Sequence, residues 1–434
     1  MRSSSCSACA VVLTALLVVG CGSDDPAGPG GTGAPPEDFV PGDPVTVSTT
    51  SPFAECSADF NPDVTLFPDS EVEPWLVVNP NDPDHMAATW QQDRYSGGAC
   101  RGNVVSVSFD GGAAWQQAVL PKLAPCSGGE WERATDPWLT FAANGDLYSA
   151  SLAITRATGD EPKHSGMLVH KSVDGGLTWG DPVLVHSSDP AGLAVQIVVL
   201  PDGTLVAVFV DKGPTISESP IFVKRSTDRG ATWPGEPIIA ATQSFVLPRL
   251  PDGDDTVRSG LIDIGMDRDT GDLHMVWEQF TDRAPPVGVA YSSSSDGGLT
   301  WSTPIRIDRT PSSTSFELEQ AFLPSVEVSD DGTIGVTYYN FQNDTLGDSR
   351  SDSDVWFIHC HPDFADCNDA ESWSNSKRLT PESFDYLAAP DSNRGYFLGD
   401  YVGLASAGRD FVTLLSVTTD DNPADAIFVP IRGE

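Results

Sequence analysis

One eight-residue pattern, S-x-D-x-G-x-x-W, occurs four times in this 434-residue chain, and its Asp positions lie 64, 54 and 68 residues apart. The Asp carboxylate can fold back onto nearby backbone N–H groups and the Gly accepts positive φ, so each copy predicts a tight turn followed by a buried Trp. A repeat of this length cannot bury its apolar face alone, which predicts a fold built from stacked copies. The Asp and Trp of the copies are Asp110 and Trp115, Asp174 and Trp179, Asp228 and Trp233, and Asp296 and Trp301.

Short apolar runs recur between these turns. Most are followed by an Asp/Gly/Asn turn and a second apolar run, a pattern typical of an all-β propeller. The last repeat has only three candidate strands, and the stretch 44–49 is a further strand near the N-terminus. We therefore predict a six-bladed β-propeller of four-stranded antiparallel blades, whose last blade is closed by the N-terminal strand. The six runs that open the blades are 73–78, 136–141, 195–199, 260–264, 323–328 and 400–404.

The four repeats resemble the Asp-boxes, or BNR repeats, of the sialidase superfamily of six-bladed β-propellers. The resemblance implies that each box lies at the hairpin between the third and fourth strands of a blade, on the outer rim, and has a structural role. Related boxes occur in glycosidases, receptors and assembly factors, so they indicate the scaffold and leave the function open. The fifth repeat lacks a box, and we expect a disulfide between Cys360 and Cys367 to hold that hairpin instead.

The resemblance also implies a central funnel lined by the first strand of each blade. Sialidases use three arginines to clamp the sugar carboxylate there, and a Tyr as nucleophile. In this chain the first arginine position holds Val72, and its neighbours Glu71 and Glu73 are expected to repel a carboxylate. Tyr401 falls where the nucleophile would lie.

Polar residues at the starts of the predicted first strands are the candidate site. The candidate catalytic residues are Tyr401, Asp136 and Glu73. Paired carboxylates there could hydrolyse a glycoside, hold a cation or bind sugar hydroxyls, or Glu73 and Asp136 could simply fix the backbone before a proline. No cofactor and no metal are expected. The candidate ligand-binding residues of the funnel are Arg133, Arg258, Arg394 and Asp400.

The N-terminus predicts export. Residues 1–20 combine a basic start with a short apolar core, and Val18-Val19-Gly20-Cys21 matches a lipobox, which predicts lipid attachment at Cys21. The apolar run is too short to span a bilayer, and a plain secretory peptide is the alternative. Residues 21–43 are rich in Gly and Pro and predict a flexible tether, and residues 44–434 predict the propeller.

Cysteine number agrees with export. Besides the pair already predicted, Cys56, Cys100 and Cys126 can form one more disulfide, with Cys126 the expected shared partner. The sequence leaves the choice between Cys56 and Cys100 open.

Acidic residues dominate the charge. Without Arg2, which leaves with the signal peptide, 23 Lys and Arg face 62 Asp and Glu, a net −39. Such a surface repels nucleic acid and opposes an anionic sialylated glycan. We predict a monomeric, sialidase-like lipoprotein at the outer membrane or cell surface, in contact with lipid only through Cys21, that binds a glycan or a cell-surface protein. The alternatives are an exo-α-sialidase-type glycoside hydrolase built around Tyr401 and a structural scaffold of the envelope.

Overall fold

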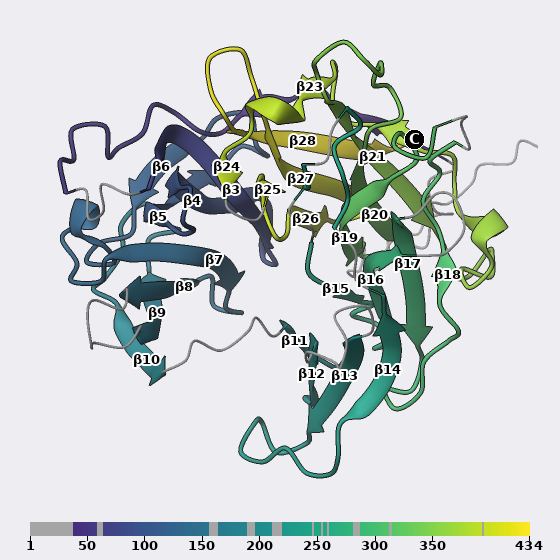
Figure 1. The fold of residues 1–434 in the computed structure, drawn as a ribbon. Coiled ribbons are helices and arrows are strands. Elements are labelled where there is room, and N and C mark those ends of the chain that lie inside the picture. Colours follow the sequence, from purple (N-terminus) through teal and green to yellow (C-terminus); the bar gives the residue numbers. More distant parts are fainter. Residues whose placement is uncertain are drawn as a thin grey trace, which may run out of the picture. The chain divides into compact units, whose positions relative to one another are not determined.

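The structure is a computed structural model that describes residues 38–58, 64–155, 164–188, 196–210, 219–244, 247–252, 255–257, 260–280, 287–311, 315–392 and 395–434. Residues Pro35–Glu434 form one compact unit. The predicted signal peptide and Cys21 lie outside the described residues. Within those residues the elements are β-strands and three short 3-10 helices (Figure 1), and no helix is long and apolar enough to cross a membrane.

Consecutive strands pair antiparallel in five groups of four, and a sixth group combines the last three long strands with the two N-terminal strands. Groups one and two are continuous in one eight-stranded sheet, joined by the pair Cys100 and Ala134. The all-β propeller class with four-stranded antiparallel sheets is therefore confirmed, and the count of six blades stays a prediction. Group one is β3 (Leu66–Asn79), β4 (Asp82–Tyr95), β5 (Cys100–Ser108) and β6 (Gln116–Val119), and group two is β7 (Arg133–Phe141), β8 (Leu147–Thr155), β9 (His164–Ser172) and β10 (Val183–Ser188).

The remaining groups follow in chain order. Group three is β11 (Gln196–Val199), β12 (Leu205–Val210), β13 (Ser219–Ser226) and β14 (Ile238–Gln243), and group four is β15 (Asp263–Met266), β16 (Leu273–Phe280), β17 (Val287–Ser294) and β18 (Ile305–Arg306). Group five is β19 (Ala321–Val328), β20 (Ile334–Asn340), β21 (Asp352–Cys360) and β22 (Lys377–Arg378), with β23 (Phe384–Asp385) also on β21. Group six contains β26 (Gly403–Ala407), β27 (Asp410–Val417) and β28 (Asp425–Gly433). The small elements are η1 (Pro125–Ser127), η2 (Ala370–Ser372), η3 (Tyr386–Ala388), β24 (Asp391–Ser392) and β25 (Gly395–Tyr396).

All four boxes form the predicted turn between the third and fourth strands of a group. In the first copy, Ser108 Oγ donates to Asp110 Oδ1 at 2.8 Å, and that oxygen accepts the N–H of Ala114 at 2.9 Å. The Trp115 indole N–H donates to the Gly112 carbonyl at 2.9 Å. The Ser and Asp bonds recur in every copy. These donors hold the Asp side chains in place within the turns.

The N-terminal strands complete group six. β1 (Phe39–Pro41) pairs with the end of β28, and β2 (Val45–Thr46) pairs with its start. Phe39 is fully buried, with its ring 5.6 Å from Phe357 and 5.4 Å from Phe411, and Asp38 pairs with Lys377 at 2.6 Å. Closure by an N-terminal strand is therefore confirmed. Residues 39–41, assigned above to the tether, are part of the sheet as β1.

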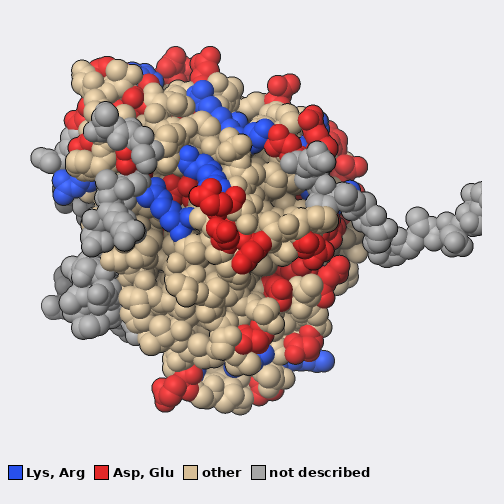
Figure 2. Space-filling view, turned by 90° about the vertical axis from the view of Figure 1, so that its right-hand side faces the viewer, with Lys and Arg blue, Asp and Glu red and all other residues tan. Residues whose placement is uncertain are grey.

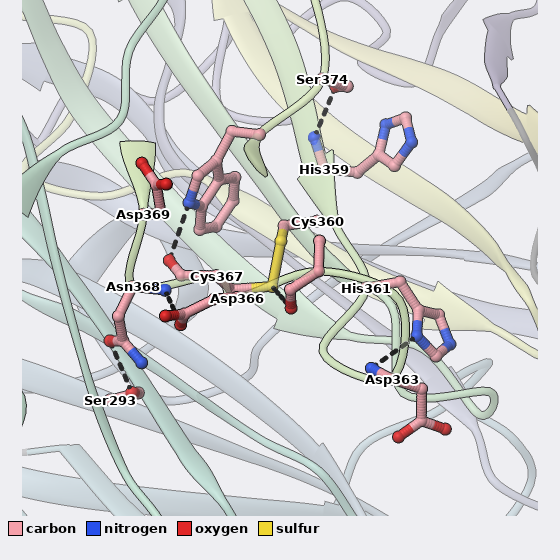
Figure 3. Close-up of a disulfide and its surroundings, with 12 residues drawn as sticks. Ser293, His359, Cys360, His361, Asp363, Asp366, Cys367, Asn368, Asp369 and Ser374 are labelled. Atoms are coloured by element: carbon pink, nitrogen blue, oxygen red, sulfur yellow. Dashed lines mark hydrogen bonds between the residues drawn. A yellow bond between two sulfur atoms is a disulfide. The ribbon is translucent and has the colours of Figure 1, made fainter. Parts of the chain in front are cut away.

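Two disulfides stabilise the hairpins and loops. Cys360 and Cys367 are bonded as predicted, at the turn where group five lacks a box (Figure 3). The Trp373 indole N–H donates to the Cys367 carbonyl at 3.0 Å and so packs against this turn. Cys56 bonds to Cys126, which settles the choice left open above, and Cys100 is buried and unbonded.

The surface carries more acidic than basic side chains. On the face of Figure 2, Asp and Glu side chains form patches scattered over the surface, while Lys and Arg lie in fewer groups. Several arginines pair with neighbouring aspartates, for example Arg378 with the buried Asp354 at 2.6 Å. These local pairs leave the net charge of the whole chain at −38.

Candidate active site

Three first strands share one backbone irregularity. β3, β7 and β19 each change register at a residue that precedes a proline, and these residues have positive φ: 55° at Glu73, 48° at Asp136 and 52° at Leu323. Positive φ is costly for residues other than glycine and persists only where the surroundings enforce it. The two acidic members are the candidates named from the sequence, and the third is a buried leucine.

A glutamate of the preceding group supports two of these positions. Glu73 Oε2 accepts the N–H of Asp136 at 3.3 Å, and Glu278 Oε1 accepts the N–H groups of Leu323 and Gly260, each at 2.7 Å. Glu73 therefore does fix backbone, as the structural interpretation expected, although the backbone is that of the next group. The Asp136 side chain is not needed for the bulge, because Leu323 forms the same one without a carboxylate.

The side chains of Glu73 and Asp136 also meet each other. Asp136 hydrogen-bonds to Glu73 through its carboxyl group and accepts the Thr135 hydroxyl at 2.8 Å. Gln91 joins the two from β4, donating to Glu73 Oε2 and, at 2.9 Å, to Thr135 Oγ1. Glu73 is buried, whereas the residue Asp136 as a whole is only half-buried.

Burial raises the pKa of both members of this pair. Burial, followed by the charges of Asp136 and Asp400, raises the pKa of Glu73 well above its ordinary value. Burial, with a contribution from Asp400, also raises the pKa of Asp136. The Arg94 guanidinium opposes both shifts; it donates to Gln91 Oε1 at 2.9 Å and lies 3.5 Å over the Phe397 ring.

The segment before β26 brings two more candidates to the pair. The N–H of Glu73 donates to the Leu398 carbonyl at 3.0 Å. A Cβ on Gly399 would lie 2.6 Å from the Tyr401 carbonyl oxygen and 3.2 Å from the Cα of Glu73, so glycine is needed for this close approach. Asp400 and Tyr401 follow directly, and the charge of Asp400 acts on both members of the pair. Four predicted residues are thus brought together from groups one and two and from the segment before β26: Glu73, Asp136, Asp400 and Tyr401.

Aromatic rings form one side of this arrangement. The indoles of Trp75 and Trp138 stack with their centroids 3.6 Å apart, and the Tyr401 ring meets them edge-on at 6.1 and 5.5 Å. All three are only half-buried. We call Glu73, Trp75, Asp136, Trp138, Asp400 and Tyr401 the carboxyl–aromatic site.

Tyr401 lies in the site but is not activated there. Its hydroxyl donates to the Pro137 carbonyl at 3.0 Å. Burial and the charges of Glu73, Asp136 and Asp400 raise the pKa of Tyr401 well above its ordinary value. Tyr401 therefore stays protonated at neutral pH, which disfavours it as a nucleophile.

The charge expected of the two glutamates beside Val72 needs correction. Val72 is fully buried in the apolar core, and Glu71 and Glu73 are buried as well. Burial is the largest of the effects that raise the pKa of Glu71 to about 9, so it is neutral at pH 7. The two glutamates are therefore not the pair of exposed anions expected beside Val72.

Within the described residues, the predicted arginines form no clamp for a sugar carboxylate. Arg133 is buried, where its guanidinium lies 4.4 Å from the centre of the Tyr95 ring and donates to the Gly98 carbonyl at 2.7 Å, so it presents no accessible charge. Arg258 and Arg394 lie outside the described residues. Among the described residues, no group of three or more His, Cys, Asp and Glu side chains is arranged to hold a metal ion.

Several residues of the site were not predicted as such. Trp75, Trp138, Gln91 and Thr135 complete it, and Arg94 adds the positive charge. The signal for the two tryptophans was present, because Glu73-Pro74-Trp75 and Asp136-Pro137-Trp138 repeat one acid-Pro-Trp motif. Gln91 and Arg94 come from the neighbouring strand β4, and no sequence pattern relates them to the motif.

Comparison with known proteins supports the fold. No family model matches the chain, and no curated protein matches it. A structure of unknown function from Dyadobacter fermentans is similar at a TM-score of 0.53 and 13% identity, over 86% of this chain and 100% of the other. A Penicillium chrysogenum α-L-arabinanase complexed with arabinobiose is similar at a TM-score of 0.50 and 14% identity, over 91% of this chain and 98% of the other. A Hadza microbial sialidase is similar at a TM-score of 0.48 and 17% identity, over 83% of this chain and 65% of the other.

At these identities the likeness concerns the fold alone. The resemblance seen in the Asp-boxes thus extends to the architecture of β-propeller glycoside hydrolases.

Proposed function

We propose that this chain is an exported propeller that binds a neutral glycan at the carboxyl–aromatic site. The observation that carries the proposal is the meeting of three half-buried aromatic rings with Glu73, Asp136 and Asp400. Aromatic faces can cover the apolar face of a sugar ring while a few polar groups orient its hydroxyls. The net negative charge and the three carboxyl groups favour an uncharged ligand over a sialylated one.

A sialidase-type hydrolase is supported less well. Tyr401 is engaged with a carbonyl and holds its proton, and the nearby charges that act on it are negative. The similarity to an arabinanase complexed with arabinobiose agrees with a neutral saccharide as ligand, although it bears on the fold alone.

The test is a glycan array probed with the mature chain in detergent micelles, run beside turnover of a fluorogenic sialoside. We expect neutral glycans to be retained and the sialoside to remain intact. Retention of no glycan would contradict the proposal and favour a protein partner. Sialoside turnover that Tyr401→Phe abolishes would instead support the sialidase alternative.

Replacing Trp138 by Ala is expected to weaken glycan binding roughly tenfold or more, because removal of an aromatic anchor costs about 2 kcal/mol. Titration calorimetry with a glycan retained on the array measures the change. Phe109→Ala removes an exposed aromatic ring of the first Asp-box and is the matched control, expected to bind as the wild type does. Equal affinity of the two variants would contradict a role for the ring in binding.

Export and lipid attachment are part of the proposal. Two disulfides suit an oxidising compartment, and the lipobox precedes Cys21. Cys21→Ala is expected to leave the precursor unprocessed or the protein released from the membrane fraction. Mass spectrometry of the mature N-terminus checks this, and an unmodified N-terminus elsewhere in the wild type would refute lipidation.

A further inference from the structure

The carboxyl–aromatic site contains one acidic side chain that the fold does not require. Leu323 occupies the equivalent bulge in group five without a carboxylate, and Glu278 supports it there as Glu73 supports Asp136. The role of Glu73 in the fold is thereby explained, whereas the bonds of the Asp136 carboxyl, to Thr135 and Glu73, are not what holds the bulge. An acid held at positive φ, where a buried leucine is also accepted, points to a chemical role.

We propose that Asp136 is the proton donor of a glycoside-hydrolysing site, and that Glu73 is the residue that positions it. The inference rests on the proposed function, because it assigns a reaction to the glycan bound at the same site. It differs from sialidase chemistry, since Tyr401 takes no part as a nucleophile.

The geometry fits this role. Thr135 and Glu73 fix the Asp136 carboxyl from two sides, and Trp138, two residues along the same strand, supplies a ring for the sugar. The charged and titratable groups that act on Asp136 are Glu73 from β3, Arg94 from β4 and Asp400 from the segment before β26. Burial, followed by the charge of Asp400, raises the pKa of Asp136, whereas the hydrogen bonds with Thr135 and Glu73 and the charge of Arg94 lower it.

The reaction balances without a cofactor. Asp136 gives its proton to the glycosidic oxygen, and the bond between that oxygen and the anomeric carbon breaks with its electron pair going to the oxygen. Water adds to the anomeric carbon, and its proton passes to Asp400. Solvent then returns a proton from Asp400 to Asp136, so one water is consumed for each bond cleaved.

The leaving group provides the decisive test. The mature chain in detergent micelles is assayed on the glycans retained by the array and on phenyl and 2,4-dinitrophenyl glycosides of the common neutral pentoses and hexoses. Asp136→Asn is expected to lower kcat/KM for the phenyl substrates by about 10²–10⁴-fold, the usual contribution of a general acid. The loss on dinitrophenyl substrates should be far smaller, because that leaving group needs no proton. Asp421→Asn, at an exposed aspartate, is the matched control.

A positioning role for Glu73 has its own signature. Glu73→Gln keeps an acceptor for the Asp136 N–H but removes the carboxyl whose hydrogen bond lowers the pKa of Asp136, so Asp136 should hold its proton more firmly. The pH at which activity falls on the alkaline side should therefore move upward, which a purely structural change would not produce. An unshifted profile would refute this role.

Three outcomes overturn the assignment of Asp136. If glycans are retained but no substrate is cleaved, the site binds without catalysis and the proposed function survives alone. If Asp136→Asn lowers kcat/KM equally for the phenyl and dinitrophenyl substrates, or does not lower it for either, another residue donates the proton. If nothing is bound and nothing is cleaved, both proposals fall.

Discussion

Deleting residues 22–52 is expected to lower the free energy of unfolding by several kcal/mol. The deletion removes β1 and β2 and leaves the edge of β28 unpaired. It also removes the fully buried Phe39, and loss of a buried Phe side chain costs about 3–5 kcal/mol by itself. Such a loss is a large share of the stability of a typical domain. Thermal or urea unfolding of the purified chain measures it.

A shorter deletion gives the control. Removing residues 22–37 takes away most of the predicted tether but leaves Asp38 and Phe39 in place, so unfolding should be unchanged. If neither deletion changes the unfolding midpoint, the N-terminal strands do not stabilise the sheet by closing it. A loss in the shorter deletion as large as in the longer one would place the stabilising contacts before residue 38.

Replacing Glu71 by Gln is expected to stabilise the protein increasingly as the pH rises above about 4.5. Glu71 is buried, and its Oε1 accepts from Gln92 Nε2 at 2.5 Å. Its pKa is about 9 in the folded chain, mainly because of burial and despite the Gln92 bond, against an ordinary value of 4.5. Gln keeps the acceptor and needs no proton.

The sign follows from proton binding. Between pH 4.5 and 9 the folded chain holds a proton on Glu71 that the unfolded chain has released, so the free energy of unfolding falls with rising pH. The slope from one such group is at most about 1.4 kcal/mol per pH unit. The Gln variant loses this slope, and the two proteins should differ little below pH 4.5.

Urea unfolding at several pH values tests this. Glu55→Gln removes the same charge from an exposed position and should leave the pH dependence unchanged. A Glu71→Gln variant with the same slope as the wild type would mean that Glu71 is ionised in the folded protein.

The repeated turns could be predicted from the sequence because their chemistry is local. In each box the Ser, Asp, Gly and Trp interact within eight residues, so the pattern specifies the turn wherever it occurs. The Cys360–Cys367 bond spans a similarly short stretch and was predicted for the same reason. The strand order within each group followed from the apolar runs that recur between these turns.

The site could be predicted only in part, because it depends on contacts between groups. Glu73, Asp136, Asp400 and Tyr401 were found from their place at the starts of first strands. That Glu71 is neutral depends on its burial against group six. The Glu71 N–H donates to the Ala424 carbonyl, and the Ser416 hydroxyl donates to the Glu71 carbonyl. Arg133 illustrates the same limit, because its burial against Tyr95 depends on the loop after β4.

The unbonded Cys100 gives the protein a built-in reporter of local opening. Its thiol is buried between β5 and β7, where it donates to the Ala134 carbonyl at 3.1 Å, and burial raises its pKa far above the ordinary value. A thiolate is the form that alkylating reagents attack, so Cys100 should react only when β5 and β7 separate. Its labelling rate therefore measures how often the seam between groups one and two, next to Glu73 and Asp136, comes apart in the native protein.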